Sequence, residues 1–178
     1  MNEATLVDDG SGLAPEGEGW FVLNAKDARW RDNPDFGRGV RFEGTGSASF
    51  KELGVNIRVL QPGHPLCKYH AENAQEDFLI LAGTGTLIVE GEERPLRRWD
   101  VVHCPAWTKH VLVATADEPL VVLAIGTRPD REELLYPVDE TALKHGAGVE
   151  TETTDGDVAY ASSATSSPTR YVEGDLPA

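Results

Sequence analysis

Lysine, cysteine and long apolar runs are all scarce in this sequence of 178 residues. Only five lysines stand among the 16 basic residues, against 30 acidic ones, and the formal net charge is -14. A surface of that charge repels phosphate backbones and anionic headgroups, so we expect neither nucleic acid nor a membrane as a partner. The longest apolar stretch, Leu120–Ile125, is far below the ~20 residues of a membrane-spanning helix.

The two cysteines, Cys67 and Cys104, are too few for a disulfide framework. The N-terminal sequence MNEATLVDDG lacks the basic and then apolar order of a secretory signal. We therefore expect a cytoplasmic protein with reduced, buried thiols, and a redox pair is the alternative. The length suits one domain, and 40% hydrophobic residues are enough to bury a core.

Composition divides the chain into three zones. Residues 1–50 are rich in Gly, Asp and Arg, and we expect an N-terminal arm that packs on the main body with one or two strands. Residues 51–127 form the main body. Residues 128–178 are expected to be a partly flexible C-terminal extension with one short helix, which Asp139 would cap and Gly146 would end.

Short β-rich runs separated by turn residues fill the central zone. They are Val55–Leu60, Phe78–Ala82, Thr86–Glu90, Val101–Cys104, Val111–Thr115 and Leu120–Ile125. Many short strands at even spacing, with no room for crossover helices, are typical of an all-β sandwich or barrel. The acidic run Glu90–Glu93 is expected to be a solvated hairpin tip.

Four polar residues of this zone point to chemistry. His70 and Glu72 are two residues apart, so they face the same side of a strand. Glu76 begins the next run, and a hairpin would return it beside them, whereas His110 comes from far along the chain. Two imidazoles and two carboxylates are costly to bury unless a divalent cation neutralises them. The pattern predicts a metal site of His70, Glu72, Glu76 and His110, and a metal-free hydrogen-bonded network is the alternative.

The spacing of these residues resembles the two motifs of the cupin superfamily. The first motif, G(X)5HXH(X)3,4E(X)6G, is matched by His70, Glu76 and Gly83, with Glu72 in place of the second histidine and one extra residue after Gly63.

The second motif, G(X)5PXG(X)2H(X)3N, is matched by Pro105 and His110. Trp99 and Trp107 replace its two glycines, and Ala114 replaces its asparagine. The resemblance covers residues 54–126. It implies an all-β fold: a single cupin (double-stranded β-helix, or jelly-roll) barrel with an extended N-terminal arm and a short C-terminal helix plus tail.

The resemblance also implies one divalent metal ion. Cupins usually hold it with three histidines and one glutamate, and Glu72 in a histidine position hardens the ligand set. This favours Mn²⁺ or Fe²⁺, although Zn²⁺ accepts the same ligands. Glu72 is either a fourth ligand or a proton shuttle beside the metal.

Cupins include dioxygenases, decarboxylases and isomerases, so the resemblance implies a metal-dependent enzyme that acts on a small molecule inside the barrel. A non-catalytic module that binds or senses a small ligand or a metal is the alternative. Lys68 shares strand parity with His70 and could contact an anionic substrate, and Trp107 could roof the barrel mouth. The resemblance further implies a homodimer.

Overall fold

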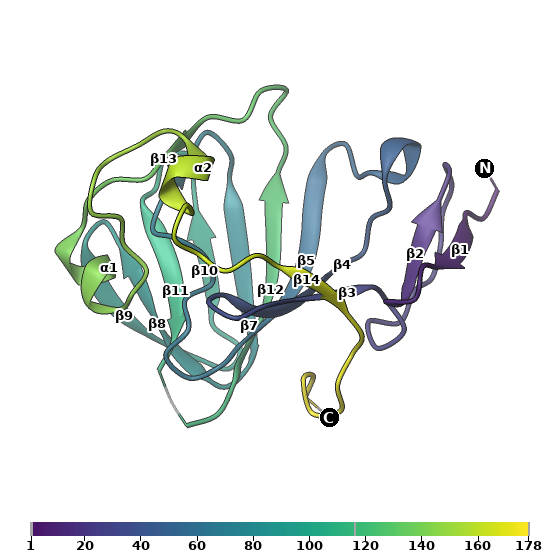
Figure 1. The fold of residues 1–178 in the computed structure, drawn as a ribbon, viewed down its shortest axis with the longest axis horizontal. Coiled ribbons are helices and arrows are strands. Elements are labelled where there is room, and N and C mark those ends of the chain that lie inside the picture. The colour runs from purple at the N-terminus through teal and green to yellow at the C-terminus, as the bar shows by residue number, and fades with distance from the viewer. Residues whose placement is uncertain (1, 116, 178) are drawn as a thin grey trace.

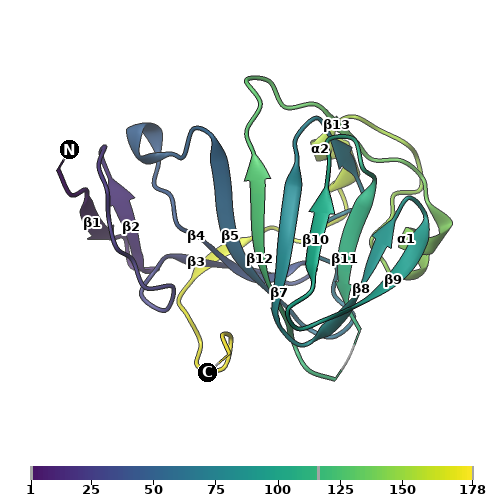
Figure 2. The ribbon, with the colours of Figure 1, turned by 180° about the vertical axis from the view of Figure 1, so that it is seen from behind.

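The computed structural model describes residues 2–115 and 117–177, whose longer strands form two sheets (Figures 1 and 2). The larger sheet has seven antiparallel strands in the order β10-β7-β12-β5-β4-β3-β14. Their bounds in that order are Val101–Cys104, Glu76–Ala82, Leu120–Thr127, Leu53–Leu60, Gly37–Arg41, Trp30–Asn33 and Ser167–Thr169. The smaller sheet has the order β11-β8-β9. Its strands are His110–Ala114, Thr84–Val89 and Glu92–Arg97.

The remaining elements are short. Two strand pairs stand apart from the main sheets: β1 (Thr5–Asp8) with β2 (Leu13–Glu16), and β6 (Ala71–Glu72) with β13 (Leu134–Leu135). The helices are η1 (Gly46–Ala48), α1 (Glu140–Lys144) and α2 (Gly156–Ala159). No helix among the described residues is long and apolar enough to cross a bilayer.

Side chains along the central strands alternate between two apolar layers. Leu60 and Phe78 lie in the barrel core, whereas Val59 and Val121 pack with Trp30 in an outer-face cluster on the opposite side of the large sheet. Successive strand residues point to opposite faces, and here both faces are covered. This double burial explains why β7 and β12 read as nearly continuous apolar runs.

The all-β barrel expected from the sequence is confirmed, and each of its six predicted strands corresponds to a strand of the two main sheets. The acidic run Glu90–Glu93 is the exposed tip of the β8–β9 hairpin, as expected, but strand β9 itself was not predicted. In the structure the strand continues to Arg97, and Leu96 is its only buried side chain. One buried position gives no apolar alternation for sequence reasoning to detect.

The short C-terminal helix is also confirmed. The Asp139 side chain accepts a hydrogen bond from the Ala142 amide at the start of α1, and Gly146 follows the helix with a φ of +69°. The sequence did not predict α2 or β14. Strand β14 pairs with β3, so the C-terminal segment joins the large sheet beside the N-terminal strands (Figure 1).

The first 50 residues contain two different kinds of structure. Strands β3 and β4 are hydrogen-bonded members of the large sheet, next to β5. The β1–β2 hairpin instead lies at the end of the molecule away from α1 and α2 (Figures 1 and 2).

Trp99 and Trp107, which replace the two glycines of the second cupin motif, both adopt left-handed backbone conformations. Their φ angles are +76° and +69°. A left-handed conformation costs a residue with a Cβ about 1–2 kcal/mol, a cost that glycine avoids. The turns therefore keep the geometry that glycine favours, although tryptophan occupies them.

We expect Trp99→Gly to be more stable than Trp99→Ala by about 0.5–1 kcal/mol. Both variants lose the contact of the exposed ring with Arg98, but only glycine removes the backbone strain. That gain of ~1–2 kcal/mol exceeds the ~0.5–1 kcal/mol that glycine costs through chain entropy. Urea unfolding of both variants measures the difference, and an alanine variant of equal or greater stability would contradict it.

Candidate metal centre

His70 and His110 meet because their backbones form an antiparallel bridge with each other. The amide of His110 donates to the carbonyl of His70 at 2.8 Å, and the amide of His70 donates to that of His110 at 3.2 Å. Residues paired in this way project side chains on the same face. Their ring centroids are 5.0 Å apart, and both residues are buried.

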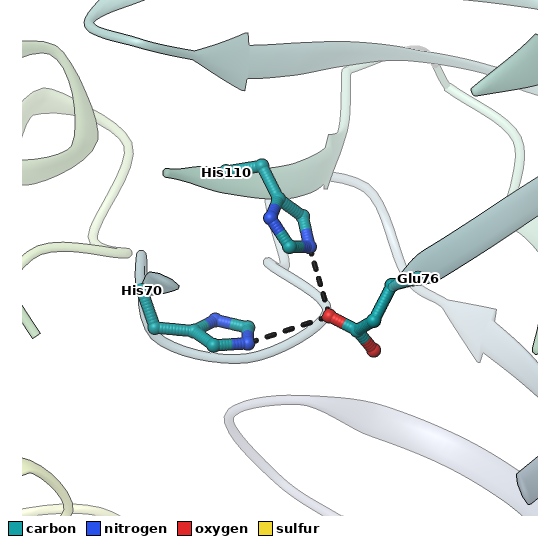
Figure 3. A group of neighbouring side chains, drawn as sticks. All are labelled: His70, Glu76 and His110. Atoms are coloured by element: carbon teal, nitrogen blue, oxygen red, sulfur yellow. Dashed lines mark ion pairs between the residues drawn. The ribbon is translucent and has the colours of Figure 1, made fainter. Parts of the chain in front are cut away.

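Glu76 completes a cluster of three groups (Figure 3). It is the first residue of β7, and its Oε2 atom lies 3.0 Å from Nε2 of His110 and 3.5 Å from Nε2 of His70. One ligand atom from each of the three residues lies within 4.8 Å of the others. Atoms at this separation can share one small cation.

Backbone carbonyls fix which nitrogen of each imidazole faces the cluster. Nδ1 of His70 lies 2.9 Å from the Lys68 carbonyl, and Nδ1 of His110 lies 2.9 Å from the Thr108 carbonyl. A carbonyl oxygen only accepts, so each Nδ1 carries the proton and donates it. In the neutral rings, both Nε2 lone pairs are then directed at the space beside Glu76, which is the tautomer that metal ligation requires.

Two of the clustered atoms lack the partners that buried polar atoms normally have. Glu76 Oε2 and His110 Nε2 are buried and make no hydrogen bond within the described part of the chain. Leaving buried polar atoms unsatisfied costs about 1–3 kcal/mol each. A divalent cation between them would satisfy both, so the residues present fit a metal ion.

Without a cation, the three groups compensate one another electrostatically. Burial alone would raise the pKa of Glu76, but the adjacent His110 and His70 imidazoles outweigh it and lower that pKa to about 2. Burial alone would lower the pKa of His110, but the Cys104 thiol and Glu76 outweigh it and raise that pKa to about 10. The pKa of His70 is likewise raised, against burial, by Cys67 and Glu76. The pocket therefore favours opposite charges held close together.

Glu72, the fourth predicted ligand, lies beside this cluster and is not one of the three groups that meet within 4.8 Å. It is half-buried in β6, and its carbonyl accepts a hydrogen bond from the Trp107 amide at 2.6 Å. Burial and the nearby Glu76 carboxylate raise the pKa of Glu72 to about 7. Its carboxyl is therefore close enough to the cluster for its protonation to depend on Glu76.

The two residues predicted to line a substrate pocket lie in different surroundings. Lys68 Nζ is within 3.4 Å of the Gly146 carbonyl and 3.3 Å of the Gly148 carbonyl, both in the segment after α1. The chain around Lys68 is a bend rather than a strand, so parity with His70 does not fix where its ammonium points. Trp107 is 49% exposed. The hydrogen bond from its backbone amide to the Glu72 carbonyl places its turn next to β6.

Sequence reasoning did not identify two tyrosines near the cluster. The ring of Tyr136 lies 6.0 Å from that of His70, and the ring of Tyr160 lies 5.8 Å from that of Tyr136. Both come from the C-terminal extension, where no apolar periodicity signals packing on the barrel. The short apolar run at residues 134–138 is the signal that the sequence offers for Tyr136, whereas Tyr160 stands in a largely polar segment.

Each cysteine is associated with one histidine of the cluster. Cys67 Sγ lies 3.6 Å from Nδ1 of His70, and the buried Cys104 thiol contributes to the raised pKa of His110. Both thiols are free. They border the centre without forming a disulfide.

Residues 56–126 match the family described as Cupin domain, which places the family's sequence pattern over β5 to β12. A curated relative, 5-nitrosalicylic acid 1,2-dioxygenase from a Bradyrhizobium species, is 32% identical over 89 residues. The match covers 47% of this chain and 42% of that protein, so the chain spans less than half of the relative's length.

Two solved structures share the fold. One is a sugar phosphate isomerase of the cupin superfamily from Silicibacter pomeroyi, with a TM-score of 0.50 and 22% identity over 86% of this chain and 83% of that one. The other is the polyketide cyclase RemF from Streptomyces resistomycificus, with a TM-score of 0.53 and 10% identity over 62% of this chain and 82% of that one. Together, the family match over residues 56–126 and the shared barrel fold support a cupin-type protein.

Proposed function

We propose that the protein binds one divalent metal ion through Nε2 of His70, the Glu76 carboxylate and Nε2 of His110. The observation that carries this proposal is the pair of buried atoms, Glu76 Oε2 and His110 Nε2, which have no hydrogen-bond partner among the described residues. The carbonyl contacts that leave both Nε2 atoms facing Glu76 support it further.

We further propose that the protein is a metal-dependent enzyme that acts on a small molecule in the barrel. Two histidines and one carboxylate leave coordination positions open, and a bound ion would supply a Lewis acid or an oxygen-binding site there. Glu72 lies beside the three ligands, so we assign it to proton transfer rather than to ligation. Trp107, next to Glu72, would help to exclude water. Among dioxygenase, decarboxylase and isomerase chemistry, similarity to the 5-nitrosalicylic acid dioxygenase favours the first.

The second candidate is a non-catalytic module that binds or senses a metal or a small ligand. Open coordination positions distinguish the two, because a structural site is closed by protein ligands whereas a catalytic site keeps exchangeable water. Three converging groups rather than four favour the enzyme.

Metal content tests the proposal. We expect about one Mn, Fe or Zn ion per chain, measured by mass spectrometry on untagged protein as purified and after reconstitution with each metal. The metal present in the protein as purified, rather than the one bound most tightly, identifies the ion, because N/O sites generally bind Zn²⁺ more tightly than Mn²⁺ or Fe²⁺. Mn²⁺ and Fe²⁺ are the expected candidates. Protein that contains no metal and takes up none on reconstitution would overturn the proposal and leave a ligand-binding barrel.

Two wider expectations remain proposals. A homodimer is supported by β10, which lies at the edge of the large sheet and exposes 72% of Val101. A cytoplasmic location is supported by the two free cysteines.

A further inference from the structure

A cavity of about 830 Å³ lies along β3, β4 and β5. Its lining is rich in positively charged side chains, although the net charge of the chain is -14. Five arginines line it, and Glu43 is the only acidic residue among its lining side chains. The five are Arg29, Arg31, Arg41, Arg58 and Arg128. Arginines gathered in this way carry a local field opposite in sign to that of the whole protein.

Three of these arginines are already occupied by groups of the protein. Arg29 pairs with Asp9 at 2.8 Å, Arg128 pairs with Glu43, and Arg31 bonds to the hydroxyl and carbonyl of Ser166. Arg41 and Arg58 have no carboxylate partner within the described part of the chain, so their charge is available to a ligand.

Arg58 is the unusual member, because it is buried without a counterion. Its Nη2 donates to the Phe36 carbonyl at 2.9 Å, but its Nε is buried and has no hydrogen-bond partner among the described residues. The side chain lies flat against Gly39, where an added Cβ would come within 2.7 Å of the Arg58 Cδ. Burial lowers the pKa of Arg58, and nearby Arg41 lowers it further. A buried cation without a partner is costly, and a bound anion would offset that cost.

The cavity and the candidate metal centre share one face of the large sheet. In β12, Gly126 pairs with Gly54 of β5 on one side and with Glu76 of β7 on the other. The Glu76 side chain lies over Gly126, and the Arg128 side chain lies over Gly54. Because the two paired glycines have no side chains of their own, Glu76 and Arg128 lie directly against the sheet between the cavity and the metal ligands.

A row of aromatic rings leads from the cavity to the candidate metal centre. Phe36 and Tyr160 line the cavity, and their ring centroids are 5.4 Å apart. The Tyr160 ring packs against that of Tyr136, which in turn lies next to the ring of His70. A ligand in the cavity would thus have cationic groups at one end and aromatic faces toward the metal centre.

We propose that this cavity binds the negatively charged group, a carboxylate or a phosphate, of a small molecule whose remainder extends toward His70 and Glu76. Arg58 and Arg41 hold the anion, because they are the two lining arginines without an acidic partner among the described residues. As a statement about substrate class, the inference rests on the proposed metal-dependent function. As an anion site, it rests on the arginines alone.

Calorimetric titration of metal-free protein with two probes, inorganic phosphate and benzoate, at constant ionic strength tests the site. We expect the wild type to bind at least one probe, and Arg58→Gln and Arg41→Gln each to weaken binding at least ~10-fold, because each removes a charged hydrogen-bond donor. Binding of phosphate alone assigns a phosphoryl group, and binding of benzoate alone assigns a carboxylate. Binding of both supports a general anion site.

Arg94→Gln is the matched control, because Arg94 lies in exposed β9 outside the cavity and its loss changes the net charge equally. It should leave the affinity within ~2-fold of the wild type. Arg41 is exposed, so Arg41→Gln keeps the test decisive if the Arg58 variant fails to fold. If neither probe binds, or if the Arg94 control weakens binding equally, the anion site is overturned. Separate metal analysis of Arg41→Gln shows whether the metal proposal stands independently.

Discussion

His110→Ala is expected to weaken metal binding by at least ~100-fold and to leave purified protein essentially metal-free. The substitution removes one of three converging ligands, and even residues that merely orient a ligand typically contribute 10–100-fold to metal affinity. His110 is the best position for this test, because its Nε2 lies 3.0 Å from Glu76 Oε2 and has no other partner in the described structure. Metal titration with a competing chelator measures the change.

His103→Ala is the control for this prediction. His103 is exposed and pairs with Asp77 at 2.6 Å, so its loss should change metal affinity less than ~2-fold. Glu72→Gln provides a second comparison, because Glu72 lies beside the cluster rather than in it. If Glu72→Gln weakens binding as much as His110→Ala, then Glu72 is a ligand and the four-residue set expected from the motif is the correct one. A His110→Ala variant that keeps its metal would contradict the site.

Sequence periodicity was sufficient for the strands that are covered on both faces. Strands β7 and β12 carry nearly continuous apolar runs because one set of side chains enters the barrel core and the other enters the outer-face cluster. Strand β9 has only Leu96 buried, and β14 follows a polar segment. Their positions are set by hydrogen bonds to neighbouring strands, which leave little trace in composition.

The candidate site shows where motif spacing succeeds and where it fails. Spacing placed His70, Glu76 and His110 in one cluster, because barrel geometry fixes which strand positions face each other. It could not place Lys68, since the chain before β6 is a bend in which strand parity does not apply. The arginine cavity was also beyond sequence reasoning. Its members are spread from Arg29 to Arg128 and meet because β3, β4, β5 and β12 pair in register.

Trp30→Ala is expected to lower the free energy of unfolding by about 3–5 kcal/mol, which is the usual cost of removing a fully buried tryptophan. Trp30 is 0% exposed and lies in β3 between Val40 of β4 and Thr169 of β14. Its Nε1 donates to the Ala25 carbonyl at 2.8 Å, and its ring packs on Tyr171. One side chain thus joins the N-terminal segment, the C-terminal segment and the outer face of the sheet.

Urea unfolding followed by circular dichroism measures this cost, and Trp20→Ala is the matched control. Trp20 is 52% exposed in the same N-terminal segment, so its loss should change stability by less than ~0.5 kcal/mol. If Trp30→Ala greatly lowers the free energy of unfolding and the variant still unfolds in a single transition, then β3, β4 and β14 unfold together with the barrel. The strands that carry Arg31 and Arg41 then belong to the same cooperative folding unit as the metal ligands. A loss below ~1 kcal/mol would mean that these outer strands detach separately, and the cavity that they line would not be a preformed site.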